Sequence, residues 1–184
     1  MTPNQRQELE SQIVACTRDA KRLFEEHDET RLTRRPGEQS WSAVECLVHL
    51  NLTAAAATPL LEEAVADLRA RGATTENPSR MDLMGGLLRW FLEPGRFRAR
   101  TAAGFVPPPA VPFGEVLPEF RRRNDRLIEV LRSAEGLDLR TRRVTSPFDA
   151  RVGYNAYAMF RVLETHERRH LRQAERAAAG EEAG

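Results

Sequence analysis

Two histidines four residues apart, His166 and His170, stand in a helical pattern near the C-terminal end of the 184-residue chain. Alternating spacings of four and three residues place seven positions on one face of an α-helix, because positions i, i+3, i+4 and i+7 lie over one another. This face is apolar at first and ends in two imidazoles and an amide. Its members are Val152, Ala156, Met159, Leu163, His166, His170 and Gln173.

Two imidazoles on an inward helix face need a common partner, since a buried polar group without a hydrogen bond costs about 1–3 kcal/mol. The i, i+4 spacing lets ring nitrogens of His166 and His170 converge on one point, and imidazole is a common ligand of zinc, nickel, copper and iron. A divalent cation at this helix is the first interpretation. The alternative is a solvated, basic helix end, because charged residues interleave with the two histidines: Glu167, Arg168, Arg169 and Arg172.

A third histidine, His49, lies in the second turn of another predicted helix. Taken alone, it is interpreted as a hydrogen-bonded core histidine. If it faces His166 and His170, however, three imidazoles leave at least one coordination position of a cation open. An open position is typical of a catalytic metal site and not of a closed structural one.

The helix that carries His49 has a well-defined start. Ser42 is a candidate N-cap, and Glu45 three residues later completes a capping box. We expect this helix to run to Arg71. Pro59 should kink it unless its missing hydrogen-bond donor falls at a bend.

Four long amphipathic stretches position these residues. Their predicted spans are residues 3 to about 30, 42–71, 113–136 and 152 onward, the last after a loop over residues 137–151. A short helix is predicted over residues 81–92, and an extended proline-rich crossover without a helix over residues 104–112. Because the chain has almost no alternating apolar pattern, we expect an all-α fold: a four-helix bundle with a long crossover that carries a short extra helix.

No residue of the sequence is clearly placed as a general base. The position of Glu45 is explained by its part in the capping box, and Glu167 is expected to be a charged residue exposed to solvent. Gln173 and Asn124 are candidates to orient a ligand or a bound water, although Asn124 equally fits a role in setting helix register. Arg169 is a candidate to receive an anionic substrate group, with surface ion pairing as the alternative.

The length and composition limit the classes of protein to which the chain can belong. A chain of this length is expected to form one domain, residues 1–184, and 41% hydrophobic with 30% charged residues is typical of a soluble globular protein. No apolar run approaches the roughly 18 residues of a membrane span. The first residues lack a signal-peptide core. We therefore expect a cytoplasmic protein that does not contact a membrane.

The charge and the cysteines limit the expected partners. Basic and acidic residues nearly balance, 28 against 27, so no global field attracts nucleic acid, and nucleic acid is not expected as a partner. Cys16 and Cys46 have no metal-finger spacing and are expected to be free and buried. A small-molecule substrate is expected, and Trp90-Phe91 in the short helix is a candidate contact of a homodimer.

Two strings of residues carry a family resemblance. They are Trp41-Ser42-x-x-Glu45-x-x-x-His49-Leu50 and His166-x-x-x-His170-x-x-Gln173. With residues 81–107 between them, they resemble the DinB/YfiT-like superfamily over nearly the whole chain. The resemblance implies a four-helix bundle of up-down-down-up topology that holds a divalent metal, often nickel or zinc, on His49, His166 and His170.

The resemblance also implies an activity. The better-understood members of this superfamily are thiol-dependent transferases and isomerases that use low-molecular-weight thiols such as bacillithiol or mycothiol. We therefore expect a metal-dependent enzyme whose cation activates a water or a thiol toward a small electrophile, as a hydrolase or a thiol transferase. Iron and manganese are further candidates for the metal. The alternative is a metal-binding module without catalytic activity, which acts in a stress response or in binding a partner.

Overall fold

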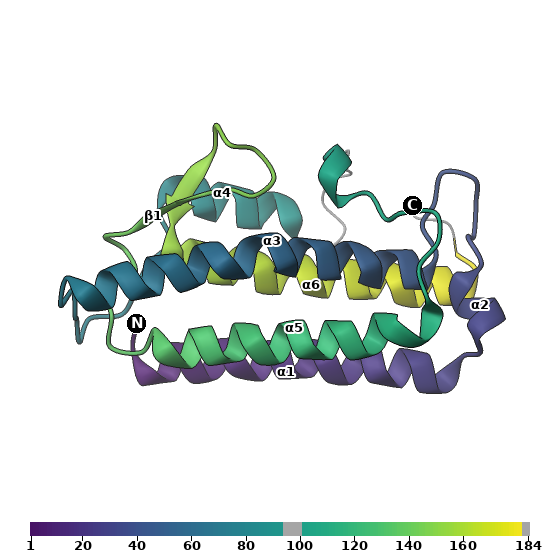
Figure 1. Cartoon of the computed structure of the whole chain (residues 1–184), viewed down its shortest axis with the longest axis horizontal. Coiled ribbons are helices and arrows are strands. Elements are labelled where there is room, and N and C mark those ends of the chain that lie inside the picture. The colour runs from purple at the N-terminus through teal and green to yellow at the C-terminus, as the bar shows by residue number, and fades with distance from the viewer. Residues whose placement is uncertain (94–100, 182–184) are drawn as a thin grey trace.

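The structure is a computed structural model that describes residues 1–93 and 101–181. Four long helices lie side by side in an elongated bundle (Figure 1). They are α1 (Pro3–Glu26), α3 (Ala43–Ala70), α5 (Phe113–Ser133) and α6 (Ala156–Ala179). The prediction of an all-α four-helix bundle is confirmed.

The four helices run up-down-down-up. In Figure 1, α1 and α6 advance from left to right along the chain, whereas α3 and α5 advance from right to left. Helix α3 packs against α5 and α6, and α1 packs against the same two helices. Because α3 and α5 are parallel neighbours, the chain between them must return along the bundle, and this crossover carries α4 (Leu83–Leu92) and a 3-10 turn, η1 (Ala103–Phe105).

The predicted start of α3 is confirmed. The Ser42 hydroxyl accepts a hydrogen bond from the Glu45 backbone N–H (3.2 Å), and the Glu45 carboxylate accepts one from the Ser42 backbone N–H (2.8 Å). The helix continues through Pro59, whose side chain is exposed, so the missing donor falls on the solvent side. It ends at Ala70, one residue before the predicted end.

The first helix is shorter than predicted. Helix α1 ends at Glu26, and α2 (Glu29–Thr33) is a separate short helix. The cause is Asp28, whose carboxylate accepts a hydrogen bond from the Arg31 backbone N–H at 2.8 Å and so begins a new helix.

Two short strands replace part of the predicted loop over residues 137–151 and the predicted start of the last helix. Strand β1 (Arg143–Thr145) pairs antiparallel with β2 (Gly153–Asn155). Helix α6 therefore begins at Ala156 and not at Val152, with Asn155 as its N-cap. Strands of three residues are too short to show an alternating apolar pattern, which explains why the sequence did not reveal them.

The crossover is not fully extended. Turn η1 overlaps residues 104–112, where no helix was predicted. Helix α4 falls within residues 81–92, where a short helix was predicted. It packs directly on α6, since a Cβ atom at Gly85 would stand 2.2 Å from the Cβ of Ala158. Gly85 is therefore required for this close contact.

A buried polar belt divides the apolar core into two clusters. On α5 the belt falls between Phe120 of one cluster and Leu127 of the other, and on α6 between Leu163 and Leu171. The belt consists of Thr53, Asn124, Glu164, Thr165, His166 and Glu167, all of them buried.

By length and composition alone, helix α3 is long and apolar enough to span a membrane, although the sequence was expected to hold no such run. In the structure, 61% of its most apolar stretch is buried inside the bundle. Burial of this kind is found in the core helix of a soluble protein.

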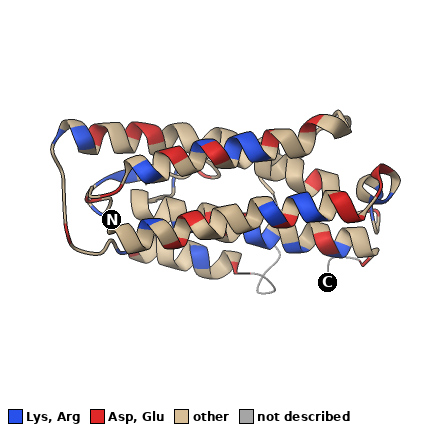
Figure 2. Ribbon diagram, turned by 90° about the horizontal axis from the view of Figure 1, so that it is seen from below, with Lys and Arg blue, Asp and Glu red and all other residues tan. Residues whose placement is uncertain are grey.

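Charged residues are spread over the bundle surface. Figure 2 shows Lys and Arg interspersed with Asp and Glu along the helices. Arg126 pairs with Glu62 of α3, and Arg132 pairs with Glu10 of α1, each at 2.6 Å. Exposed pairs contribute only about 0–1 kcal/mol each, so they align neighbouring helices more than they stabilise the fold.

Candidate metal centre

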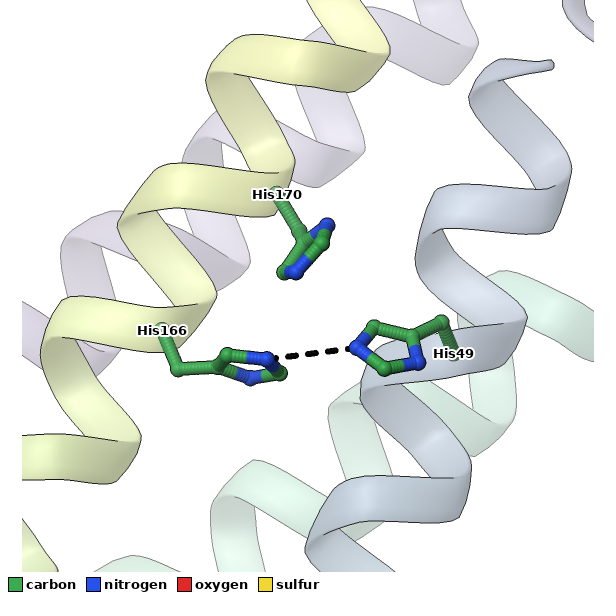
Figure 3. A group of neighbouring side chains, drawn as sticks. All are labelled: His49, His166 and His170. Atoms are coloured by element: carbon green, nitrogen blue, oxygen red, sulfur yellow. Dashed lines mark hydrogen bonds between the residues drawn. The ribbon is translucent and has the colours of Figure 1, made fainter. Parts of the chain in front are cut away.

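Three histidines meet between α3 and α6 (Figure 3). His49 comes from α3, and His166 and His170 lie one turn apart on α6. The ring centroids are 4.5–5.0 Å apart. One ring nitrogen of each histidine lies within 4.8 Å of those of the other two, so the cluster could hold a metal ion.

The distances suit a small divalent cation. Nitrogen ligands at 2.0–2.1 Å from a tetrahedral ion are about 3.3 Å apart. The Nε2 atoms of His49 and His166 are 3.2 Å apart. Three protein ligands leave a fourth position for a water or a substrate, as in catalytic zinc sites.

The crossover orients His49. The Nδ1 atom of His49 lies 2.8 Å from the backbone carbonyl oxygen of Phe105, in turn η1. Because a carbonyl oxygen can only accept a hydrogen bond, Nδ1 carries the proton and Nε2 keeps its lone pair facing the other histidines. Sequence reasoning missed this contact, since a backbone carbonyl in a proline-rich segment leaves no signal in the residue pattern.

Burial keeps the histidines neutral. It lowers the pKa of His166 well below its usual value and that of His170 to about 3, and the neighbouring histidines act in the same direction. Burial also lowers the pKa of His49, opposed by the bond to Phe105. Neutral imidazole is the form that binds a metal ion.

Two ring nitrogens lack a hydrogen-bond partner in the part of the chain that the structure describes. They are the Nδ1 atoms of His166 and His170. An unpaired buried polar atom costs about 1–3 kcal/mol. The nitrogen of His166 that faces His49 is Nε2 and not the unpaired Nδ1, so the fit of these residues to a divalent metal rests on the convergence of one ring nitrogen from each histidine within 4.8 Å.

Aromatic side chains surround the three histidines. The ring of Trp41 lies 5.0 Å from that of His49, and the ring of Phe148 lies 5.5 Å from that of His166. Phe148 also contacts Phe105, at 4.9 Å between centroids. These rings pack beside the three histidines. Trp41 belongs to a string that was noticed in the sequence, whereas Phe148 was taken only as part of a loop.

The expectation that Glu167 is exposed to solvent is wrong. Its side chain is buried in the polar belt, where the Asn124 amide nitrogen approaches it at 3.5 Å. Burial, followed by the charge of Glu164, raises the pKa of Glu167 to about 8. Glu167 directly follows His166 on α6, so its side chain leaves the helix in a different direction, toward α1 and α5.

Asn124 and Gln173 have different surroundings. The Asn124 amide donates to the Thr17 hydroxyl of α1 (3.0 Å), so its contacts join α1, α5 and α6 and do not reach a histidine. These contacts agree with a role in helix register. Gln173 is half-buried on α6, and its side chain acts to raise the pKa of His170, against the stronger lowering effect of burial.

Glu45 and Arg169 make structural contacts. Besides capping α3, the Glu45 carboxylate accepts hydrogen bonds from Arg35 Nε at 2.8 and 3.1 Å. Arg169 donates to the backbone carbonyls of Phe91 (3.3 Å) and Leu92 (3.5 Å), at the end of α4. Both side chains thus hold connecting segments in place beside the cluster.

Comparison with protein families gives a match over most of the chain. Residues 12–174 match the family model described as the DinB superfamily, a span that includes all three histidines. Searches of the curated proteins and of the solved structures gave no match.

Proposed function

The chain belongs to the DinB superfamily, and from this premise we propose that it is a metal-dependent enzyme that holds one divalent cation on three histidines and acts on a small electrophile. The ligands would be His49, His166 and His170. One observation supports the proposal above all: three neutral imidazoles from two helices present ring nitrogens within 4.8 Å of one another.

Nickel or zinc is the proposed metal. Both accept imidazole readily, and iron or manganese is the alternative if geometry at the remaining positions favours them. When bound, such a cation lowers the pKa of a water or thiol ligand and makes it a nucleophile near neutral pH.

The chain's own residues position the reactants. The Phe105 carbonyl fixes the tautomer of His49, and the rings of Trp41 and Phe148 exclude water from the cluster. Exclusion of water strengthens electrostatic interactions at the site. Gln173, next to His170, is the proposed contact for a bound nucleophile.

The surroundings of Glu45 and Glu167 favour a thiol over water. Of the carboxylates considered from the sequence, Glu45 binds Arg35 and Glu167 lies in the polar belt, so neither serves as general base. A thiol with a pKa near 8.5 needs a much smaller shift than water to lose its proton at neutral pH. We therefore favour transfer of a low-molecular-weight thiol: the sulfur bonds to the electrophilic carbon, the leaving group departs with its electron pair, and the thiol proton passes to solvent. Such thiols are kept reduced in the cytoplasm, the compartment we propose.

Metal analysis tests the ligand set. The protein purified without chelators should contain about one divalent ion per chain, and His166→Ala should lose it. His27→Ala is the matched control, because His27 lies at the end of α1 outside the cluster and should leave metal content unchanged. Unchanged metal in the His166 variant would contradict the assignment.

Cobalt substitution separates an enzyme from a non-catalytic module. An open coordination position should bind azide or a small thiol and shift the visible absorption of the cobalt protein. A spectrum that does not respond to either ligand would indicate a closed site and would remove the enzymatic proposal while leaving the metal site in place.

A further inference from the structure

A groove of about 480 Å³ lies between α3 and α5, two helices that pack against each other. Its volume falls within the usual range of small-molecule sites, about 300–1,000 Å³. Both helices contribute side chains to it, among them Thr58 and Pro59 of α3 and Glu119, Arg122 and Arg123 of α5. We call it the α3–α5 groove. None of the three histidines lines it.

Three arginines line the groove from one face of α5. Glu119, Arg122, Arg123 and Arg126 follow the spacing i, i+3, i+4 and i+7, which places them over one another on the helix. Both Arg122 and Arg123 form ion pairs with the carboxylate of Glu119, and Arg123 Nε lies 2.6 Å from it. One carboxylate between two guanidiniums leaves a local excess of positive charge. This part of the groove is therefore suited to an anion.

Arg122 and Arg123 keep hydrogen-bond donors that these ion pairs do not use. A guanidinium has five N–H groups. Within the described part of the chain, only Nη2 of Arg122 and Nε of Arg123 donate to a protein acceptor. Arg126 is more fully engaged, because Glu62 of α3 and Glu129 of α5 pair with it at 2.6 and 2.7 Å. The donors left for a ligand thus lie mainly on Arg122 and Arg123.

A buried hydroxyl lines the same groove. Thr58 is 5% exposed, and its hydroxyl has no hydrogen-bond partner within residues 1–93 and 101–181. A threonine in a helix can donate to the carbonyl oxygen four residues earlier. Thr17, Thr33 and Thr53 do so, at 2.8–3.2 Å, whereas Thr58 does not. An unpaired buried hydroxyl destabilises a fold, and a ligand that accepts its hydrogen bond removes this cost.

We propose that the α3–α5 groove binds a phosphate group through Arg122, Arg123 and Thr58. Arginine is the preferred residue for phosphate, because its planar guanidinium donates two parallel hydrogen bonds. A phosphate group presents three strong acceptor oxygens, so it can accept from both guanidiniums and the hydroxyl together. A carboxylate has only two oxygens. Thr58 reaches the ligand by a change of its χ1 rotamer, since threonine occupies two rotamers in a helix.

The groove is separate from the proposed metal centre. Thr58 follows His49 by nine residues on α3, which is about 14 Å along the helix axis. The histidines lie between α3 and α6, whereas the groove lies between α3 and α5 (Figure 3). The groove is therefore a second site, and the phosphate proposal and the enzyme proposal can fail independently.

Titration calorimetry of the full chain with inorganic phosphate, at constant ionic strength, tests the proposal. The wild type should bind with a dissociation constant in the millimolar range, and Arg122→Gln or Arg123→Gln should raise it at least about fivefold. Arg132→Gln is the matched control, because Arg132 is also an exposed arginine of α5 but pairs with Glu10 of α1 outside the groove. A wild-type chain that does not bind phosphate would overturn the proposal.

Thr58→Val separates a built site from a general attraction to arginine. Valine has nearly the same shape without the hydroxyl, so thermal unfolding should show a variant at least as stable as the wild type. Its dissociation constant for phosphate should nevertheless rise at least about threefold. Equal affinity of this variant and the wild type would mean that surface charge alone attracts phosphate, which contradicts the proposed site.

Two further measurements locate the phosphate and identify its source. Treatment with a chelator should leave the affinity unchanged, while loss of binding would place phosphate at the histidines and overturn the proposal. Adenosine monophosphate represents a soluble phosphate ester, and phosphatidylcholine vesicles with phosphatidic acid represent a lipid headgroup. Binding of either probe that is lost in Arg122→Gln supports the site and identifies the source. Binding of both probes that persists in this variant would refute it.

Discussion

The Nδ1 atom of His49 donates to the backbone carbonyl oxygen of Phe105 over 2.8 Å. This bond joins α3 to the crossover turn η1, and it determines which nitrogen of His49 faces His166. The turn itself is held by the ring of Phe105, which is buried against Phe148. A side chain outside the cluster thus controls the orientation of a proposed metal ligand.

Phe105→Ala should weaken metal binding by about 10–100-fold, the usual effect of losing an interaction that orients a ligand. Titration calorimetry with zinc measures the change, and the circular dichroism spectrum should remain helical. Val106→Ala is the control, because Val106 is adjacent and largely exposed. Equal affinity of the Phe105 variant and the wild type would show that the turn does not orient His49.

The metal-free protein should lose stability as the pH falls below about 6.5. An unfolded histidine takes up a proton near this pH, whereas burial holds the pKa of His170 at about 3 and that of His166 well below its usual value. The unfolded chain then binds more protons, so the free energy of unfolding should fall by up to about 2 kcal/mol per histidine between pH 6.5 and 5. Urea unfolding in the presence of a chelator measures this loss. It should be smaller in His170→Gln, and an equal loss would contradict the prediction.

Glu167→Gln should stabilise the metal-free protein at alkaline pH. Burial and the charge of Glu164 raise the pKa of Glu167 to about 8, against roughly 4.3 in an unfolded chain. The native carboxyl keeps its proton between these values, so its favourable contribution is complete below pH 4.3 and is lost as the pH rises through 8. From pH 6 to 9 the variant should gain about 1–4 kcal/mol relative to the wild type in chemical unfolding. Glu26→Gln, at an exposed position, should show no such gain. Parallel pH curves for Glu167→Gln and the wild type would refute a buried, protonated carboxyl.

Gly85→Ala should destabilise the chain by about 1–3 kcal/mol, because the added methyl group would overlap Ala158 of α6. Gly86→Ala, one residue away, should be neutral or stabilising by up to about 1 kcal/mol. Thermal unfolding compares the two variants. Similar melting temperatures would mean that α4 does not rest on α6 through Gly85.

Much of the fold follows from local signals in the sequence. The capping box of Ser42 and Glu45 marks the start of α3, and the spacing of four and three residues along α5 and α6 identifies the faces that pack inward. Asp28 and Asn155 each cap the start of a helix with a short polar side chain. Near these two residues the observed helix boundary differs from the predicted one by several residues. Periodicity alone does not show at which residue a helix begins or ends.

The candidate site could be predicted only in part. His166 and His170 are close in sequence, and the resemblance added His49, so the cluster was accessible before any coordinates. The Phe105 carbonyl was not, because a backbone atom carries no residue signature. The exposure of Glu167 was predicted wrongly, because a charged side chain is normally expected in solvent. Its position on α6 instead directs the side chain toward Asn124 and the interior.

The polar belt constrains how the helices can slide along one another. A shift of α5 by one turn would move Asn124 away from Thr17 and Glu167 and set its amide among leucines of one apolar cluster. A shift of α6 would do the same to Glu164 and Glu167. Misaligned bundles are therefore destabilised by buried polar groups without hydrogen-bond partners. The alignment that remains is the one in which the three imidazoles lie at the same level of the bundle.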